Sequence, residues 1–354
     1  CTAFLQGLAT QELEPERLLP SDPDHPLVYT LRAVRPLGPR PVPEIVSRPD
    51  VVRAADAQVL MYHRVFQQDP DPHHLCVRPA TFRAHLDYLT RERVVLPLVE
   101  LAARAAEGTL PPRAVALTFD DGYRDGLIAA ELLAEERCPA THFVTSGRLA
   151  GEQPEFWWDQ ISRILVSELA LPAALDVPAL GLRGLATRTA SERLAAHGRL
   201  AEALMCAEER ARAEGLAEFV TWSGHQLAPR ASHATLTPAE VQALDQLWGQ
   251  SVGAHTDSHL LLTTQTSAVR RREIRGSRAR LEPLLGRPVT EFSYPYGSHD
   301  PETVRLVREA GYTVAVAAEP DRVRPGTPAL LIPRYEVREQ SADALAELLA
   351  LSPS

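Results

Sequence analysis

The sequence LTFDDGYRD, from Leu117 to Asp125, changes from apolar residues to two adjacent carboxylates followed by a glycine. Its apolar part ends the run AVALTF (114–119), which predicts a buried strand. Asp120 and Asp121 therefore stand where a strand ends, although two neighbouring like charges repel each other. A polar turn after the strand is one interpretation. The other is that two acids are needed within reach of one reacting atom.

Strands and helices alternate along most of the chain. Strands are predicted at 58–65, 114–119, 140–145, 251–255, 290–295, 312–317 and 329–333, and helices at 81–89, 125–137, 267–285 and 301–310. This alternation favours a parallel α/β sheet. About seven strand–helix units come close to a TIM-type barrel, in which the chemistry lies where strands end. Asp120, Asp121, His255, Pro295 and Tyr296 all fall at predicted strand ends.

Three segments differ from this pattern. Residues 1–56 are Pro-rich and indicate an extended linker or tail, because frequent prolines prevent helix formation. Residues 157–248 are rich in Ala, Glu and Arg and predict a mostly helical insertion, with Thr237 capping a helix that begins at Pro238. The third segment, 341–354, is expected to be a C-terminal helix or tail. We therefore expect a catalytic barrel over 57–340.

Composition and charge argue against several classes of protein. The net charge of -9 argues against a nucleic-acid partner, which would require a basic face. The sequence contains no lysine, so neither a P-loop lysine nor a lysine Schiff base is possible. No apolar run approaches the roughly 18 residues of a transmembrane helix, and no signal peptide is visible. We expect a cytoplasmic or cell-envelope-associated protein, and its oligomeric state stays open.

The segment HTDSH supplies His255 and His259 at i and i+4. If it begins a helix, both imidazoles face the same way at a spacing that suits one metal ion; a chance pair among 12 histidines is the alternative. Two histidines and an aspartate would form a three-ligand site with an open position for water. A metal lowers the pKa of such a water to about 7. One aspartate would then bind the cation, and the other would take the proton.

Three motifs occur in a fixed order: TFDDG (118–122), HTDSH (255–259) and YPYG (294–297). In this order they resemble the polysaccharide deacetylases, also called the NodB-homology family or carbohydrate esterase family 4. The flanking stretches VLMYHRV (59–65), FWWD (156–159) and FSYPYG (292–297) resemble the branch with YPYG in place of an arginine-containing motif. The resemblance covers roughly residues 57–340.

The resemblance implies a distorted (β/α)7 TIM-like barrel with one divalent metal ion, most often Zn²⁺. It implies a hydrolase that removes N-acetyl, and sometimes O-acetyl, groups from sugars. Carried over to this sequence, Asp120 is the general base, and Asp121, His255 and His259 are the metal ligands. The backbone N–H of Tyr296 helps to stabilise the oxyanion.

Two positions depart from the family pattern. The arginine that many members have before the motif proline, where it steadies the catalytic aspartate, is Ser293 here. The late histidine that serves as general acid is replaced in the stretch IPRYEV by Arg334. We therefore expect Arg334 to hydrogen-bond Asp120 in place of the missing arginine, as a planar fork suited to a carboxylate. The general acid would then be His63, at the end of the first strand, or Asp120 itself; a polar strand-end residue is the other interpretation of His63.

Pro295, Tyr296 and Asp159 are candidate substrate contacts, although Asp159 also suits the N-terminus of a helix. Trp157 and Trp158 favour packing over sugar stacking. The preferred function is a metal-dependent carbohydrate N-deacetylase acting on a polysaccharide or a sugar precursor. An O-acetyl esterase, a deformylase on a lipid-linked sugar and a non-catalytic carbohydrate-binding barrel are the alternatives. The sequence names neither the carbohydrate nor the native metal.

Overall fold

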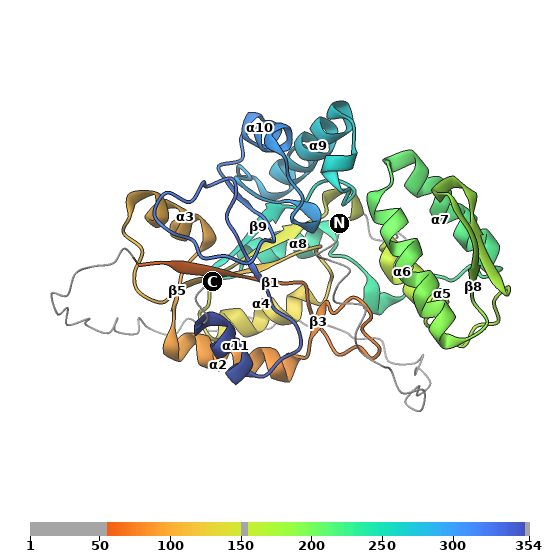
Figure 1. The fold of residues 1–354 in the computed structure, drawn as a ribbon. Helices are drawn as coiled ribbons and strands as arrows, with labels where there is room; N and C mark the ends of the chain where they lie inside the picture. Colours follow the sequence, from red (N-terminus) through yellow and green to blue (C-terminus); the bar gives the residue numbers. More distant parts are fainter. Residues whose placement is uncertain (1–54, 150–154, 351–354) are drawn as a thin grey trace.

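The structure is a computed structural model that describes residues 55–149 and 155–350. The predicted Pro-rich segment 1–56 lies outside the described residues, apart from its last two positions. The described chain forms a curled parallel sheet surrounded by helices, with a smaller unit beside it (Figure 1).

A parallel sheet forms the centre of the molecule, as predicted. Seven strands follow one another by hydrogen bonding, and an eighth, β4, pairs with the start of β5. In spatial order the strands are β11 (Val314–Val316), β10 (Glu291–Ser293), β9 (Gln250–Ala254), β6 (Ala140–Val144), β5 (Ala114–Phe119), β1 (Ala57–Tyr62) and β12 (Tyr335–Glu336), with β4 at Val94–Val95. The fold is therefore the expected (β/α)7 barrel in its distorted form.

Between β11 and β12 the barrel is closed by the segment 329–333, whose backbone is irregular. Ala315 N–H donates to the carbonyl of Ala329 at 2.8 Å, and Ile332 N–H donates to the carbonyl of Ala315 at 2.9 Å. We predicted a strand at 329–333, and this is wrong: the segment makes one isolated bridge, and β12 begins only at Tyr335. The next donor, the Arg334 N–H, bonds to the carbonyl of Glu319 at 3.1 Å and not to that of Ala317, so the ladder with β11 does not continue.

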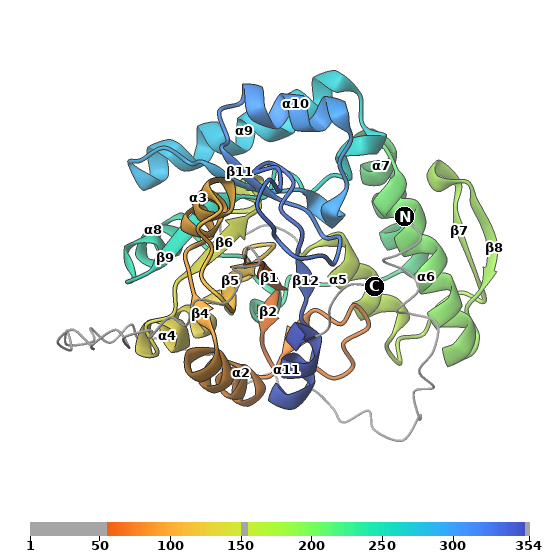
Figure 2. The ribbon, with the colours of Figure 1, turned by 60° about the vertical axis from the view of Figure 1, so that its left-hand side comes forward.

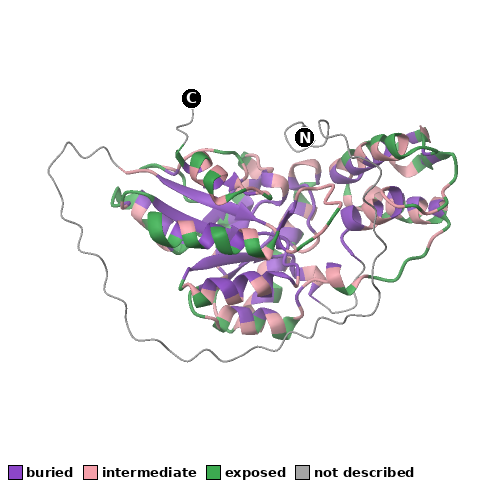
Figure 3. Ribbon diagram, turned by 90° about the horizontal axis from the view of Figure 1, so that it is seen from below, coloured by how far each residue is buried: buried purple, intermediate pink, exposed green. Residues whose placement is uncertain are grey.

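In the described part of the chain, helices pack around the sheet (Figure 2). They are α2 (Pro79–Glu92), α3 (Leu98–Glu107), α4 (Gly126–Glu135), α8 (Pro238–Gln246), α9 (Ser267–Leu285), α10 (Pro301–Glu309) and α11 (Ala342–Ala350). The sheet strands are buried almost throughout, whereas the helices turn exposed faces outward (Figure 3). The predicted cap of α8 is confirmed, since Thr237 and Glu240 form a capping box.

The C-terminal helix α11 belongs to the barrel. Leu345 and Leu349 are buried in the same apolar cluster as Phe82, Leu86 and Leu89, the predicted inner face of α2. Gln58 in β1 also donates to the carbonyl of Leu349 at 2.9 Å. Of the helix or tail expected over 341–354, the described part is a packed helix as far as Ala350.

The insertion between β6 and α8 forms a separate small unit at the side of the barrel (Figure 1). Its apolar cluster includes Leu175, Leu200, Leu204 and Phe219 and continues into the barrel at Tyr123 and Leu261. Its elements are α5 (Trp157–Leu165), β7 (Ala174–Val177), η4 (Pro178–Leu180), β8 (Leu182–Ala186), α6 (Ala190–Cys206) and α7 (Glu209–Ser223). The antiparallel hairpin of β7 and β8 was not predicted from the Ala-rich composition.

Short elements complete the chain. They are β2 (Arg64–Val65), β3 (Cys76–Val77), η3 (Ser146–Arg148), η5 (Ala231–His233), η6 (Leu262–Thr264) and η7 (Pro295–Gly297). Among the described residues no helix is both long and apolar enough to cross a membrane.

Candidate active site

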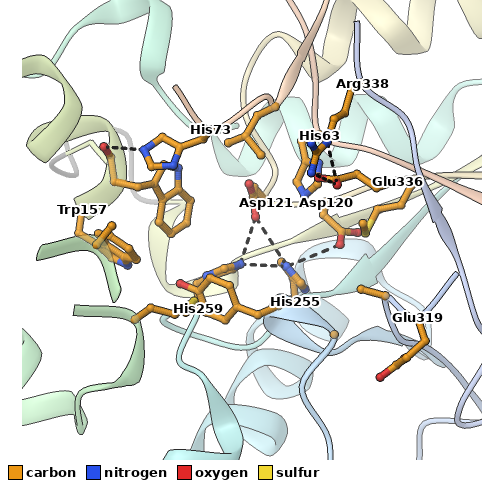
Figure 4. A pocket seen from close by; sticks show the side chains of 18 of the residues that line it. His63, His73, Asp120, Asp121, Trp157, His255, His259, Glu319, Glu336 and Arg338 are labelled. Carbon is orange, nitrogen blue, oxygen red and sulfur yellow. Dashed lines mark hydrogen bonds and ion pairs between the residues drawn. The ribbon is translucent and has the colours of Figure 1, made fainter. Parts of the chain in front are cut away.

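The three motifs meet in one cavity at the carboxyl ends of the strands (Figure 4). Asp120 and Asp121 directly follow β5, His255 directly follows β9, and Tyr296 lies in the turn after β10. Because parallel strands end on the same side of the sheet, residues far apart in the sequence converge there. The cavity has a volume of about 290 Å³.

Three buried side chains at the floor of this cavity form a candidate metal centre. His259 Nε2 lies 3.1 Å from His255 Nε2 and 3.2 Å from Asp121 Oδ1, and His255 Nε2 lies 3.6 Å from the same oxygen. Ligands about 2.0–2.1 Å from a tetrahedral zinc ion stand about 3.3–3.4 Å apart. The three donors, each buried, therefore fit one divalent ion such as zinc.

The segment that carries both histidines is a loop and not the start of a helix. Thr256 has φ 60° and His259 has φ 54°, in the left-handed region. These two residues turn the chain tightly, and His259 N–H donates to Thr256 Oγ1 at 3.0 Å. The imidazoles converge because the loop curls, and not because a helix places residues i and i+4 on one face.

The hydrogen bonds of His255 determine which of its nitrogens can bind a metal. Its Nδ1 lies 2.9 Å from the carbonyl oxygen of Ser293, which can only accept, so Nδ1 carries the proton. Burial lowers the pKa of His255 to about 4, although Asp120 opposes this shift. The neutral ring then presents the lone pair of Nε2 toward Asp121 and His259.

Arg334 makes the contact with Asp120 that we expected. Its guanidinium is fully buried and donates from Nη1 to Asp120 Oδ1 at 2.8 Å and from Nη2 to Asp120 Oδ2 at 2.7 Å. The other donors reach Thr118 Oγ1, Ser293 Oγ and the carbonyl oxygen of Ala317. All five N–H groups of the arginine are thus satisfied, and Ser293 itself donates to Asp120 Oδ2 at 3.1 Å.

This arrangement keeps Asp120 ionised. Burial alone would raise the pKa of its carboxyl group, but the charge and hydrogen bonds of Arg334 outweigh burial and hold the pKa well below its usual range. Asp120 Oδ2 lies 3.9 Å from His255 Nε2, beside the candidate metal centre. Asp121 also has a lowered pKa, because its hydrogen bond with His259 outweighs burial.

The structure brings some of the other predicted residues to the cavity and leaves others outside it. His63 and Tyr296 line the cavity with the candidate ligands, whereas Pro295 is buried in η7 and is not part of the lining. Asp159 also does not line this cavity, although its neighbours Trp157 and Trp158 do. Its carboxylate accepts a hydrogen bond from Tyr123 at 2.6 Å, and burial raises its pKa to about 7.

The two sides of the cavity differ in polarity (Figure 4). Trp157 and Trp158 from α5 and Ala201 and Met205 from α6 form an apolar wall on the side of the insertion. On the opposite side Glu319, Glu336 and Arg338 line the mouth, and Glu336 accepts a hydrogen bond from Arg338 at 2.7 Å. Both tryptophans are buried and also line the cavity.

Glu273 in α9 was missed by the sequence analysis. Its fully buried Oε2 accepts the backbone N–H groups of Asp257 and Ser258, at 3.2 and 2.7 Å, and so holds the histidine loop. Nothing distinguishes this glutamate in the sequence from the other charged residues of the helix. Only the fold brings it beneath the loop.

The sequence model described as polysaccharide deacetylase matches residues 107–170 and 224–315. The matched residues contain TFDDG, HTDSH and YPYG, and the gap at 171–223 falls within the insertion. A search of curated proteins found no match.

Solved structures share the fold at low sequence identity. The Streptococcus pyogenes deacetylase PplD in complex with acetate aligns with a TM-score of 0.56 at 18% identity, covering 83% of this chain and 98% of that one. IcaB from Ammonifex degensii aligns with a TM-score of 0.55 at 18% identity, covering 84% and 98%. A polysaccharide deacetylase from Bacillus cereus aligns with a TM-score of 0.54 at 17% identity, covering 83% and 69%.

The common fold, the three motifs and their convergence on one cavity agree with the sequence match. Through residues 107–170 and 224–315, the chain therefore belongs to the polysaccharide deacetylase family, a family of hydrolases that act on carbon–nitrogen bonds.

Proposed function

We propose that this chain is a metal-dependent hydrolase that removes N-acetyl groups from a carbohydrate, either a polysaccharide or a sugar precursor. The observation that carries the proposal is the cluster of Asp121, His255 and His259 with Asp120 beside it in a single cavity. The family match supports carbohydrate deacetylation as the general reaction.

Asp121, His255 and His259 would hold one divalent ion, and zinc suits two imidazoles and a carboxylate. The same donors accept other divalent ions, so the native metal depends partly on availability. A metal in this position supplies a water whose pKa is lowered to about 7 and a positive charge near the scissile carbonyl.

Asp120 would accept the proton of the attacking water. Its carboxylate is ionised and lies near the candidate ligands, which is the placement a general base requires. Arg334 would act through Asp120, since the two parallel hydrogen bonds fix the plane of the carboxylate. Arg334 is therefore proposed as a positioning residue.

Tyr296 would contribute its backbone N–H to the oxyanion that forms during attack. The turn that presents it is unusual, because Tyr296 has φ 59° and the following Gly297 has φ 68°. A side chain on Gly297 would collide with Ala318, which accounts for the glycine. His63, which lines the same cavity, or Asp120 after it has taken a proton, would protonate the leaving amine.

The polarity of the cavity indicates how the substrate would lie. Sugar hydroxyl groups need hydrogen-bond partners when they leave water, and these stand on the side of Glu319, Glu336 and Arg338. The acetyl methyl group needs none and suits the apolar wall that contains Trp157 and Met205. The acyl group would therefore point toward the insertion and the sugar toward the opposite rim.

The test is an assay of chelator-treated protein, with and without added zinc, on N-acetyl, N-formyl and O-acetyl sugars of the same backbone. We expect zinc-dependent release of acetate from the N-acetyl sugar as the fastest reaction. Faster release from the O-acetyl or the N-formyl sugar would replace the proposal by an esterase or a deformylase. Binding of all three without turnover would indicate a non-catalytic barrel.

A further inference from the structure

We propose that Arg212, from the insertion, is a positioning residue that holds the backbone of the loop carrying His255 and His259. The inference rests on the proposed metal centre and goes beyond it, because it gives the insertion a part in metal binding. Arg212 lies in α7, within the segment 171–223 that the deacetylase sequence model does not match.

Arg212 reaches from the insertion to the loop with two hydrogen bonds. Its Nη1 donates to the carbonyl oxygen of His259 and its Nη2 to that of Ser258, both at 2.9 Å. One guanidinium thus fixes two consecutive peptide groups, one of which belongs to a candidate metal ligand. A planar fork with several donors suits such a contact better than an ammonium group does.

The barrel supplies the other anchors of the loop. Ser146 and Gly147 in η3 donate their backbone N–H groups to the carbonyl oxygens of Thr256 and Asp257, at 3.1 and 2.9 Å. On the other edge Glu273 accepts the N–H groups of Asp257 and Ser258. The carbonyl groups of Ser258 and His259 are held by the insertion, through Arg212.

The loop needs these anchors because its conformation is unfavourable for residues with a side chain. Left-handed backbone costs about 1–2 kcal/mol for a residue other than glycine, and Thr256 and His259 both adopt it. Without Arg212, the two carbonyl groups would need other donors, and the His259 end of the loop would be free to relax.

His259 depends on its backbone more than His255 does. The Nδ1 atom of His255 bonds to the carbonyl of Ser293, whereas Nδ1 of His259 has no hydrogen-bond partner among the described residues. The ring of His259 is otherwise bordered by Trp158 and Tyr296, with centroid separations of 4.9 and 4.7 Å. A shift of its backbone would therefore move Nε2 directly.

The test measures zinc affinity of the full chain by competition with a chelator, without substrate. We expect Arg212→Met to weaken zinc binding by about 10-fold or more, the usual effect of losing a residue that orients a ligand. Arg212→Lys, which retains a donor, should fall between Arg212→Met and the wild type.

Two arginines of the same unit serve as controls. Arg193 holds the carbonyl groups of Thr187 and Ser167 inside the insertion, and Arg210 pairs with Glu214 on the surface of α7. Arg193→Met tests whether a weakened insertion alone affects the metal, and Arg210→Met tests the loss of charge. Both should bind zinc as the wild type does.

Thermodynamic linkage provides a second readout. If Arg212 couples the two units, zinc should slow hydrogen exchange in α7 of the wild type but not of Arg212→Met. A folded Arg212→Met protein with wild-type zinc affinity overturns the inference. If that variant does not fold, two other results together overturn the inference. They are an unchanged zinc affinity of Arg212→Lys and the absence of any effect of zinc on hydrogen exchange in α7 of the wild type. Absence of zinc binding by the wild type would contradict the proposed metal centre itself.

Discussion

Two adjacent aspartates of the same charge have different surroundings. Asp120 faces a fully buried arginine, whereas Asp121 faces the imidazoles of His255 and His259. The cationic partner makes Asp120 a stable carboxylate, and the imidazoles leave room for a cation beside Asp121. On the Asp120 side, Arg334 therefore offsets the repulsion that the sequence presents at this point.

Substitution by asparagine should separate the two roles. Asp120→Asn should retain zinc and lose turnover by about 100-fold or more, because an amide cannot take a proton from water. Asp121→Asn should lose both zinc and turnover. The measurements are zinc content after gel filtration and initial rates of acetate release; equal zinc loss in the two variants would mean that the roles are wrongly assigned.

Arg334 contacts Asp120 from the residue just before β12, whereas position 293 carries a serine. Arg334→Ala should lower kcat by about 100-fold, since Asp120 loses the partner that orients it. The double variant Arg334→Ala with Ser293→Arg should recover part of the rate, because position 293 already contacts Asp120. Arg83→Ala, at an exposed arginine of α2 that pairs with Glu135 and does not line the cavity, is the control for the loss of one positive charge. A kcat of Arg334→Ala close to the wild type would contradict this assignment.

The strands and helices of the barrel could be predicted where buried runs and amphipathic faces are regular. The predicted helix 267–285 coincides with α9, and the strand ends correctly located Asp120 and His255. The loop 255–259 could not be predicted, because its left-handed residues are held by Glu273 and Arg212, which are distant in sequence. Local spacing contains no signal for such contacts.

The hairpin β7–β8 and strand β12 show the same limit. β7 and β8 are short, and their inward residues, such as Leu175 and Leu182, pack on helices of the insertion that only the fold identifies. Strand β12 has two residues and owes its place to pairing with β1. The contact between Arg334 and Asp120 could be predicted, because Ser293 stands where the resemblance implies an arginine partner for Asp120. That inference did not depend on the regular pattern of a helix or a strand.

The packing of α11 against α2 should contribute substantially to stability. Leu345 is fully buried in the cluster shared by α2, β1 and β5. Leu345→Ala should lower the free energy of unfolding by about 2–5 kcal/mol, as in other buried leucine truncations. Leu348, on the same helix and only partly buried, gives a matched control with a smaller loss. The measurement is urea unfolding, and equal effects of the two substitutions would show that α11 does not pack as described.

At the scale of the whole molecule, buried histidines predict sensitivity to acid. Burial lowers the pKa of His142, His197 and His255 to about 4 each, whereas histidine in an unfolded chain titrates near 6.5. Between these values the unfolded state binds more protons, so stability falls as the pH drops from about 6.5 to 4. Burial raises the pKa of Asp159 to about 7, so this carboxyl group binds a proton more readily in the folded state. Its titration therefore favours the folded state as the pH falls and offsets part of the loss of stability caused by the histidines.

Each of these histidines contributes up to about 1.4 kcal/mol per pH unit within that window. The metal-free protein should therefore unfold at lower urea concentrations at pH 5 than at pH 7. His197→Gln, which changes none of the candidate metal ligands, should reduce the slope of stability against pH. A stability that is flat or rises between pH 7 and pH 5 would contradict the neutral buried state of these rings.

The barrel brings the motif residues to one cavity, and the insertion closes one side of it and contacts the histidine loop. The proposed function therefore depends on one divalent ion in that cavity and on the use of that ion in deacetylation. The most direct measurement is acetate release from an N-acetyl sugar by chelator-stripped protein before and after one equivalent of zinc. We predict no release before addition and restored release after it, and none from stripped Asp121→Asn at the same zinc concentration. Two results would contradict the proposed metal-dependent deacetylation. One is undiminished acetate release by the stripped wild-type protein, and the other is release by Asp121→Asn that zinc restores to the wild-type rate.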